Sequence, residues 1–421
     1  MGNRPYHSCC WFVCILLLCL FLCPSRTYAQ AIEAGYGKGN VLKFDDWLTN
    51  DALKQQDAQS FWLGYIYQTH AGGNCGYASD YNYPTFTFGF LIADFNKVRL
   101  RYNPHNSRPI NYDSRCGTSY VVYASIRRAF FRTRSGWSAD YRFTNGIGYN
   151  TNIYDRHTNV DNIMLGSRLS VYFDVAFALC YRYRQCEFYM GPEFRHLSNG
   201  GVVRPNKGIN KLGVGAGMRY YLQPYDSISF KRTVKPFDEK KICLNIAYSS
   251  GVRASQGEWL YDANNYIWNK NDVENVKYGK EGYTTCFYHL VSADLMYRYA
   301  RRYASGIGLD ILYEPSNTHI EAQKSGSRPE NVKWTFGVAA KHEVFFRRIS
   351  MNMALGWYLS RPFNNHSNTA DEYPFYERIG LRYNLPWLND TISIGYNIYA
   401  HLTKAYGTEL FLGFRFPIIK R

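Results

Sequence analysis

Residues 165–182, LGSRLSVYFDVAFALCYR, alternate between two kinds of side chain along their length. The positions in step with Leu165 are apolar apart from Ser167, and every charged side chain falls on the positions between them. Successive side chains of a β-strand point to opposite faces, so this period predicts a strand with one apolar and one polar face. The run is longer than a typical soluble strand and suits a strand that crosses a lipid bilayer.

The same alternation returns along most of the chain. The candidate strands are 32–42, 58–71, 83–95, 118–131, 136–150, 164–182, 186–198, 209–222, 242–255, 285–300, 304–314, 333–346, 349–360, 374–385, 391–402 and 407–419. Short connections alternate with long ones, as in outer-membrane barrels, whose turns are short on the periplasmic side and longer outside. If the first strand runs outward from the periplasm, the strand 186–198 ends at the outer rim.

Composition and the start of the chain agree with this class. Residues 1–29 resemble a secretory signal peptide, with Arg4, an apolar run and a small-residue cleavage site that ends at Ala29. Aromatic residues make up 18% of the chain, yet the mean hydropathy is negative, as expected for a barrel with a polar interior. The net charge of +16 suits an anionic outer-membrane surface, and the dispersed Lys and Arg do not indicate a nucleic-acid partner. A soluble β-sandwich would have shorter strands.

We therefore predict an all-β, antiparallel transmembrane outer-membrane β-barrel with about 14–16 strands in total. Eight strands fall in the first half, 30–222, and the remainder in a C-terminal barrel region, 242–421. The connecting segment 223–241 is the best boundary between the halves. The strands can form one closed barrel or an eight-stranded barrel plus a second one. We favour the single barrel, because one aromatic-ended terminal strand suggests one insertion event.

A polar cluster interrupts an apolar face in the stretch 194–201, FRHLSNGG, which is followed by 204–210, RPNKGIN. His196 and Ser198 are two residues apart, so they share the face of a strand that is otherwise apolar. Asn210 lies on the apolar face of the next strand. Three polar side chains are therefore expected to meet on the lipid-facing exterior, near the outer rim.

This combination suits an activated hydroxyl. Ser198 would be the nucleophile, His196 the general base and then the acid, and Asn210 the group that orients the imidazole. Donors to an oxyanion are expected from the amides of Asn199, Gly201 and Asn206. The alternative interpretation is that His196 and Ser198 are interfacial residues that precede a turn.

The two stretches resemble the signature of the PagL-type lipid A 3-O-deacylases, also called acyloxyacyl hydrolases. The resemblance covers 30–222 and is strongest over 160–222, while the second half resembles the extension of longer members. It implies an outer-membrane barrel that removes an ester-linked acyl chain from lipid A of lipopolysaccharide. The family uses a Ser–His–acid triad on the barrel exterior.

The resemblance also implies roles for individual residues. His196 takes the place of the family's histidine and Ser198 that of its nucleophile, while the oxyanion positions match those given above. One departure concerns the acidic member of the triad, which falls at Asn210. An amide can hold the imidazole tautomer, but it stabilises the imidazolium less than a carboxylate does.

No cofactor or metal is expected, because the chemistry requires none and the cysteines that follow the leader lack metal-ligand spacing. The predicted partner is lipopolysaccharide in the membrane, with a homodimer as one assembly to consider. The main rival is a non-catalytic outer-membrane barrel, either a pore or a surface-binding protein. A soluble periplasmic binding module is the third hypothesis.

Overall fold

The structure is a computed structural model. It describes residues 30–43, 53–71, 77–101, 113–155, 158–159, 161–222, 230, 237, 240–254, 285–318, 330–362, 374–386, 390–401 and 404–420. The proposed signal peptide and most of the proposed connecting segment lie outside these residues. No described helix has the length and apolar character needed to cross a membrane.

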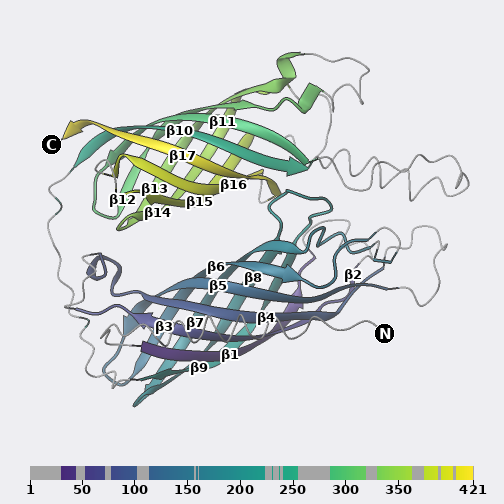
Figure 1. The fold of residues 1–421 in the computed structure, drawn as a ribbon. Coiled ribbons are helices and arrows are strands. Elements are labelled where there is room, and N and C mark those ends of the chain that lie inside the picture. The colour runs from purple at the N-terminus through teal and green to yellow at the C-terminus, as the bar shows by residue number, and fades with distance from the viewer. Residues whose placement is uncertain are drawn as a thin grey trace, which may run out of the picture.

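The first half of the chain forms a closed antiparallel sheet (Figure 1). β1 pairs with β3, the strands from β3 to β9 each pair with the next strand along the chain, and β9 pairs back with β1 to close the circle. The short strand β2 adds to the edge of β4. The strands are β1 (Gln30–Val41), β2 (Leu53–Gln55), β3 (Asp57–Gln68), β4 (Thr85–Leu100), β5 (Ser114–Arg132), β6 (Trp137–Asn150), β7 (Leu169–Tyr183), β8 (Cys186–Ser198) and β9 (Ile209–Tyr221).

The second half forms another closed antiparallel barrel, in which β17 returns to pair with β10. Two short 3-10 helices, η2 (Ser79–Tyr81) and η4 (Glu330–Lys333), lie in connections. The strands are β10 (Lys241–Ala254), β11 (Thr285–Arg298), β12 (Tyr303–Tyr313), β13 (Trp334–Phe346), β14 (Ile349–Ser360), β15 (Phe375–Asn384), β16 (Ile392–His401) and β17 (Lys404–Lys420).

The antiparallel barrel class is confirmed, but the preference for a single barrel is wrong. β9 runs back along β1, where Tyr221 pairs with Ala31, and does not continue the sheet into β10. A strand edge in lipid must have its backbone groups paired, and each eight-stranded sheet meets this condition by closing on itself. Sequence alternation defines the strands but carries no signal for where a sheet closes.

The strand predictions hold to within a few residues at each end. The largest shifts are at β4, which continues to Leu100, and at β7, which begins at Leu169. Leu165 therefore belongs to the loop before β7. Leu165 was expected to face lipid, but it is buried at 1% exposure and packs in the hydrophobic cluster of the first barrel. Its apolar character serves loop packing, which a period-two pattern cannot distinguish from a lipid-facing position.

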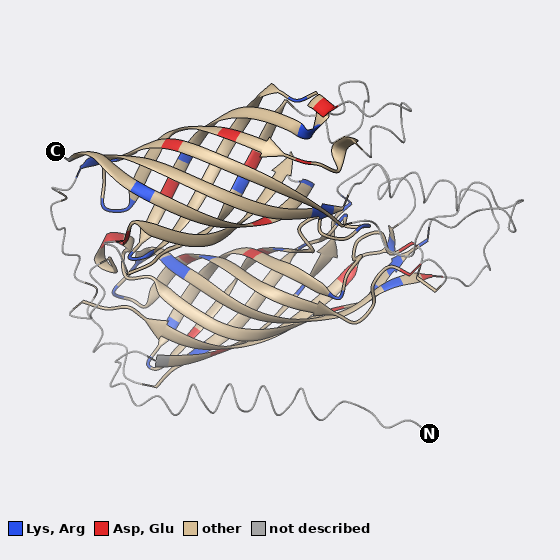
Figure 2. Ribbon diagram, turned by 45° about the horizontal axis from the view of Figure 1, so that its top comes forward, with Lys and Arg blue, Asp and Glu red and all other residues tan. Residues whose placement is uncertain are grey.

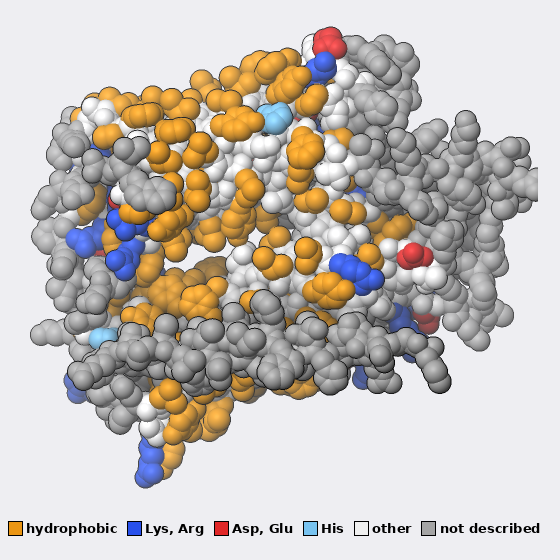
Figure 3. Space-filling model, viewed as in Figure 1, with side chains coloured by type: hydrophobic (Ala, Val, Ile, Leu, Met, Phe, Trp, Pro, Cys, Tyr) orange, Lys and Arg blue, Asp and Glu red, His pale blue; other side chains and the backbone are white. Residues whose placement is uncertain are grey.

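The two faces of the strands differ as the alternation predicts. On β7, Leu169 and Leu179 are exposed, whereas Tyr172 and Asp174 point inward and are buried. Hydrophobic side chains cover much of the visible exterior of both barrels (Figure 3). Acidic and basic residues are spaced along the strands of both barrels (Figure 2). The apolar face therefore points outward, as a barrel in lipid requires.

Ion pairs fill the interior of the first barrel. Arg219 donates to Glu33 (2.8 Å) and to Glu187 (2.5 Å), and Arg127 pairs with Glu187 (3.1 Å) and Asp140. All five side chains are at least nine-tenths buried. Buried charges are tolerated where each has a partner, so this network explains how charged residues occupy the barrel core.

The two barrels lie side by side (Figure 1). Contacts between them occur at three levels. At one end, the rings of Phe86 on β4 and Phe346 on β13 pack with centroids 5.2 Å apart. Part-way along, the Tyr396 hydroxyl on β16 donates to Asn145 Oδ1 on β6 (3.0 Å). At the other end, where β8 and β10 finish, the β8–β9 loop contacts the second barrel. We call this the outer end, because tight turns such as Arg184–Gln185 lie at the opposite end.

Candidate active site

The polar cluster predicted from the sequence forms on neighbouring strands. His196 on β8 and Asn210 on β9 are direct cross-strand partners, so their side chains share one face. The imidazole Nε2 lies 2.8 Å from Ser198 Oγ, and Nδ1 lies 2.7 Å from Asn210 Oδ1. These distances are ordinary for hydrogen bonds, and they join the three side chains into one chain of contacts.

The cluster lies on the exterior face of the first barrel. Leu212 and Val214, in step with Asn210 on β9, are 49% and 53% exposed, which marks that face as the outer one. On either side of His196 along β8, Arg195 and Leu197 point inward and are buried. Ser198 itself is only 6% exposed. The hydroxyl therefore sits at the outer end of a lipid-facing surface, in a sheltered position.

The two contacts of the imidazole fit one tautomer of His196. Because Asn210 offers Oδ1, the ring nitrogen Nδ1 carries the proton and donates to it. The other nitrogen, Nε2, is then free of a proton and accepts the hydrogen of Ser198 Oγ. This is the tautomer in which a histidine can remove a proton from a serine.

The loop after Ser198 is ordered by its own side chains. The backbone N–H of Asn199 donates to Asn206 Oδ1 (2.9 Å), and that of Gly201 donates to Asn199 Oδ1 (3.1 Å). Two of the amides expected to bind an oxyanion thus donate within the loop in this structure. The Asn206 carboxamide uses its oxygen here, which leaves its Nδ2 amino group as the part able to donate to a substrate.

Gly208 closes the other side of the cluster. Its φ is +72°, a conformation that favours glycine. A Cβ at this position would lie 2.8 Å from His196 Cε1 and 3.3 Å from Ser198 Cβ. Its backbone N–H donates to Met164 O (3.0 Å). The loop before β7 therefore supports the site. The sequence could not predict this role, because residues 165–168 follow the alternation of a strand.

A second Ser–His contact lies on the exterior of the second barrel. Ser305 Oγ is 2.8 Å from His342 Nδ1, across β12 and β13, and the Tyr303 ring stacks on the imidazole. Among the residues that the structure describes, no carboxylate or carboxamide hydrogen-bonds to that imidazole. This pair lacks the orienting group that Asn210 supplies at the first site, and it serves below as a matched control.

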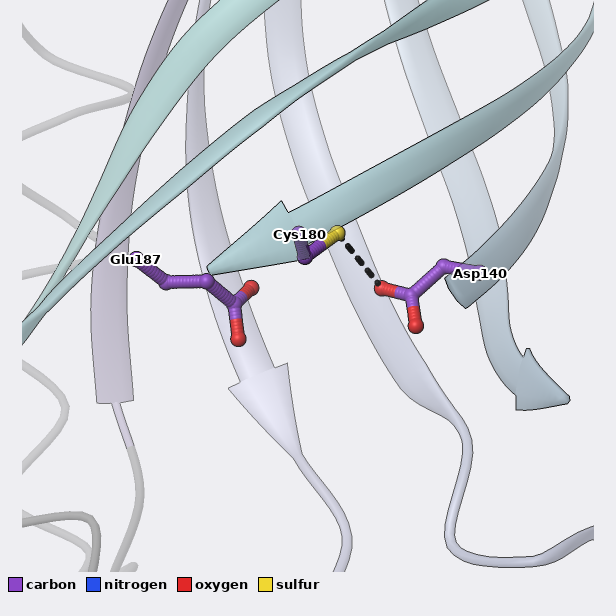
Figure 4. Close-up of side chains that lie close together, drawn as sticks. All are labelled: Asp140, Cys180 and Glu187. Carbon is purple, nitrogen blue, oxygen red and sulfur yellow. Dashed lines mark hydrogen bonds between the residues drawn. The ribbon is translucent and has the colours of Figure 1, made fainter. Parts of the chain in front are cut away.

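Asp140, Cys180 and Glu187 form the one group among the described residues whose spacing could suit a metal ion (Figure 4). Cys180 Sγ lies 3.4 Å from Asp140 Oδ2, inside the first barrel. The carboxylates already pair with Arg127 and Arg219, so the positive charge that a cation would supply is present. Within the described part of the chain, Cys116, Cys180, Cys186 and Cys243 are free thiols.

Comparison with known proteins links both halves of the chain to one family. The family model described as lipid A 3-O-deacylase (PagL) matches residues 80–219. The model described as the C-terminal domain of acyloxyacyl hydrolase matches residues 260–418. Together the two matches span more than two thirds of the chain. No curated protein matches the sequence.

Solved outer-membrane proteins align with the chain only distantly. An outer membrane channel from Pseudomonas putida F1 has 9% identity and a TM-score of 0.22, covering 94% of this chain and 97% of that one. The OccAB4 protein of Acinetobacter baumannii has 10% identity and a TM-score of 0.23, covering 93% and 99%. Scores this low add nothing to the fold, which rests on the strand pairing.

Proposed function

The chain belongs to the PagL family of lipid A 3-O-deacylases, and from this premise we propose that Ser198 removes an ester-linked acyl chain from lipid A, with His196 as its base. Membership of the family makes the protein an outer-membrane lipid A deacylase of a Gram-negative bacterium. The observation that carries the proposed mechanism is the pair of hydrogen bonds that links Ser198, His196 and Asn210 on the lipid-facing surface.

In the first half of the reaction, Ser198 Oγ attacks the ester carbonyl while its proton passes to His196 Nε2. The carbonyl oxygen becomes an oxyanion in the tetrahedral intermediate. Collapse of the intermediate breaks the bond to the sugar oxygen, which takes the proton from the imidazolium and leaves as a hydroxyl. The acyl chain remains as an ester on Ser198.

In the second half, a water molecule replaces the sugar hydroxyl. His196 Nε2 accepts a proton from this water as its oxygen attacks the acyl-serine. The second tetrahedral intermediate then releases the fatty acid, and the imidazolium returns the proton to Ser198 Oγ. Asn210 keeps the imidazole in the reactive tautomer throughout, and no cofactor enters either half.

Two features of the surface fit a lipid substrate. Leu212 and Val214 provide an exposed apolar surface below the polar cluster, along which an acyl chain can lie. The ester, at the head-group end of the chain, would then meet Ser198 at the outer end of β8. Asn206 Nδ2 is the proposed donor to the oxyanion, and one backbone amide of the loop would join it by exchanging its present partner.

The described interiors argue against the pore alternative. In the second barrel, Lys341 pairs with Asp294 and Asp310, and Arg378 pairs with Glu409, all across the interior. One cavity lined by Asp294, Lys341 and Arg378 holds about 40 Å³, and one in the first barrel holds about 20 Å³. Spaces of this size hold one or a few water molecules. A surface-binding barrel differs from an enzyme only in that it lacks activity, so an activity measurement distinguishes them. The homodimer remains a prediction.

The test is the mass spectrum of lipid A from cells that express the full chain. Wild type is expected to remove one acyl group, and Ser198→Ala and His196→Ala to leave lipid A intact. Ser305→Ala, the matched control at the other outward-facing Ser–His pair, is expected to act like wild type. Loss of the same acyl group in Ser198→Ala cells would refute the proposed mechanism, and unchanged lipid A with every variant would favour a surface-binding barrel.

A further inference from the structure

We propose that the outer end of the second barrel is a positioning element for the β8–β9 loop, and through it for the oxyanion donors beside Ser198. This inference rests on the proposed function and assigns a role in it to β10 and β17. All the side chains that would react lie in the first barrel. The second barrel would then contribute to catalysis through its contact with this loop.

The loop is bonded to the last residue of β10 from both sides. The backbone N–H of Ala254 donates to Gly201 O (2.8 Å), and Ala254 O accepts a hydrogen bond from Arg204 Nε (3.0 Å). Ala254 is 1% and Arg204 9% exposed. Hydrogen bonds shielded from water are stronger, so these two fix the distance between the loop and β10.

The loop also fits closely against the start of β17. The Thr408 hydroxyl donates to Gly200 O (3.3 Å). A Cβ at Gly200 would overlap Thr408 Oγ1, and a Cβ at Gly201 would lie 2.8 Å from Tyr406 O. Both glycines have positive φ, +67° and +83°. Glycine is therefore required at both positions by the backbone conformation and by the surface of the second barrel.

The surface that the loop meets is itself fixed. The Tyr406 hydroxyl donates to Glu314 Oε1 (2.6 Å), and Arg253 Nε lies 2.8 Å from the same oxygen. The Arg253 guanidinium also lies 4.4 Å from the centroid of the Tyr406 ring. These buried side chains tie together β10, the end of β12 and β17. A rigid support of this kind can hold a loop to the accuracy that catalysis requires.

The contact between the β8–β9 loop and the second barrel affects the proposed oxyanion donors and not the Ser198–His196 pair. Gly201 donates to the Asn199 carboxamide, and Asn199 in turn donates its backbone N–H to Asn206, so a shift of Gly201 moves the proposed oxyanion donors. The bonds of His196 to Ser198 and Asn210 are made within β8 and β9. Loss of the contact should therefore lower kcat and leave KM and the nucleophile in place.

The experiment uses the full chain, with lipid A in detergent–phospholipid micelles as substrate and fatty-acid release as readout. Thr408→Val removes the bond from β17 to Gly200 O, and Arg204→Gln removes the bond from Arg204 Nε to Ala254 O. For each variant we expect kcat to fall roughly ten- to a hundredfold with little change in KM. Thr318→Val is the control, because the Thr318 hydroxyl bonds to Pro315 O at the same end of the second barrel. It should match wild type.

A double-mutant cycle separates positioning from a general loss of structure. Asn206→Ala removes the proposed donor itself, so adding Thr408→Val to it should lower kcat little further. Additive effects, or wild-type kcat in Thr408→Val, would overturn the inference, provided that Ser198→Ala is inactive. Activity in Ser198→Ala would instead refute the proposed function. Heat-modifiable migration in gels checks folding, and if Arg204→Gln does not fold, Thr408→Val decides.

Discussion

Asn210 stands at the position where the resemblance to the PagL family places the acidic member of a serine–histidine–acid triad. Its Oδ1 accepts from His196 Nδ1 at 2.7 Å, so it selects the reactive tautomer as a carboxylate would. It carries no charge, and it therefore stabilises the developing imidazolium less. Asn210 lies beside exposed apolar residues such as Leu212, where an amide costs less to remove from water than a carboxylate would.

Asn210→Asp should therefore raise kcat while it lowers the stability of the folded barrel. We expect kcat to rise by about tenfold, because a carboxylate stabilises the imidazolium in the transition state. Asn210→Ala should lower kcat, because the imidazole loses its orienting partner. Rates of fatty-acid release per folded molecule measure both changes. A drop in kcat for Asn210→Asp would show that the neutral amide is itself required.

Gly208→Ala should abolish most of the activity. The added Cβ would press on His196 Cε1, at 2.8 Å, and the backbone at φ +72° strains any other residue by about 1–2 kcal/mol. Gly136→Ala is the matched control, since Gly136 has φ +89° in the β5–β6 turn at the opposite end. It should lose stability but keep its rate per folded molecule. Equal activity in the two variants would contradict the close packing of Gly208 on the site.

At the scale of single residues, the sequence predicted that His196, Ser198 and Asn210 lie together, but not the hydrogen bonds of the loop beside them. His196, Ser198 and Asn210 could be placed together because period two and an antiparallel hairpin define which side chains share a face. The hydrogen bonds inside the loop could not be predicted, because they depend on loop backbone conformations that alternation does not encode. The expected amide donors of Asn199 and Gly201 therefore turned out to have partners within the loop.

At the scale of the elements, the strands were largely predictable because lipid on one side and a packed polar interior on the other impose a strict alternation. The predictions that failed for individual elements concern residues whose positions this alternation does not determine. Leu165 kept the alternation but belongs to a loop that packs inward. β2 is three residues long, too short for any period to appear. Pairing of charges in the interior was also invisible, since it depends on residues far apart in the sequence.

The interior charges of β9 should matter more than charges at the surface. Arg219→Met would leave Glu33 and Glu187 with less compensation, and we expect a loss of about 3–5 kcal/mol in the free energy of unfolding. Arg348→Met is the control, because Arg348 and Asp390 form an exposed pair, and it should cost at most about 1 kcal/mol. Urea unfolding in lipid vesicles measures both. Equal losses would mean that the interior network does not stabilise the barrel.

For the whole molecule, the sequence indicated two halves and left open whether they form one barrel or two. Closure depends on which edge strands meet, and β1 with β9 and β10 with β17 find each other across many residues. The contact between the barrels was equally hidden, because Gly201 and Ala254 belong to separate motifs in the sequence. The resulting arrangement places the cluster of the first barrel beside the outer end of the second.

The central claim is that the Ser198 hydroxyl, facing lipid, is the nucleophile that attacks the ester. The most direct measurement treats the purified full chain with a long-chain alkyl fluorophosphonate and locates the adduct by mass spectrometry of its peptides. We predict that the adduct lies on Ser198 in the wild type and is absent from His196→Ala, while Ser305 remains unmodified. Labelling of any other residue in a protein that actively deacylates lipid A, or undiminished labelling of His196→Ala, would contradict the account.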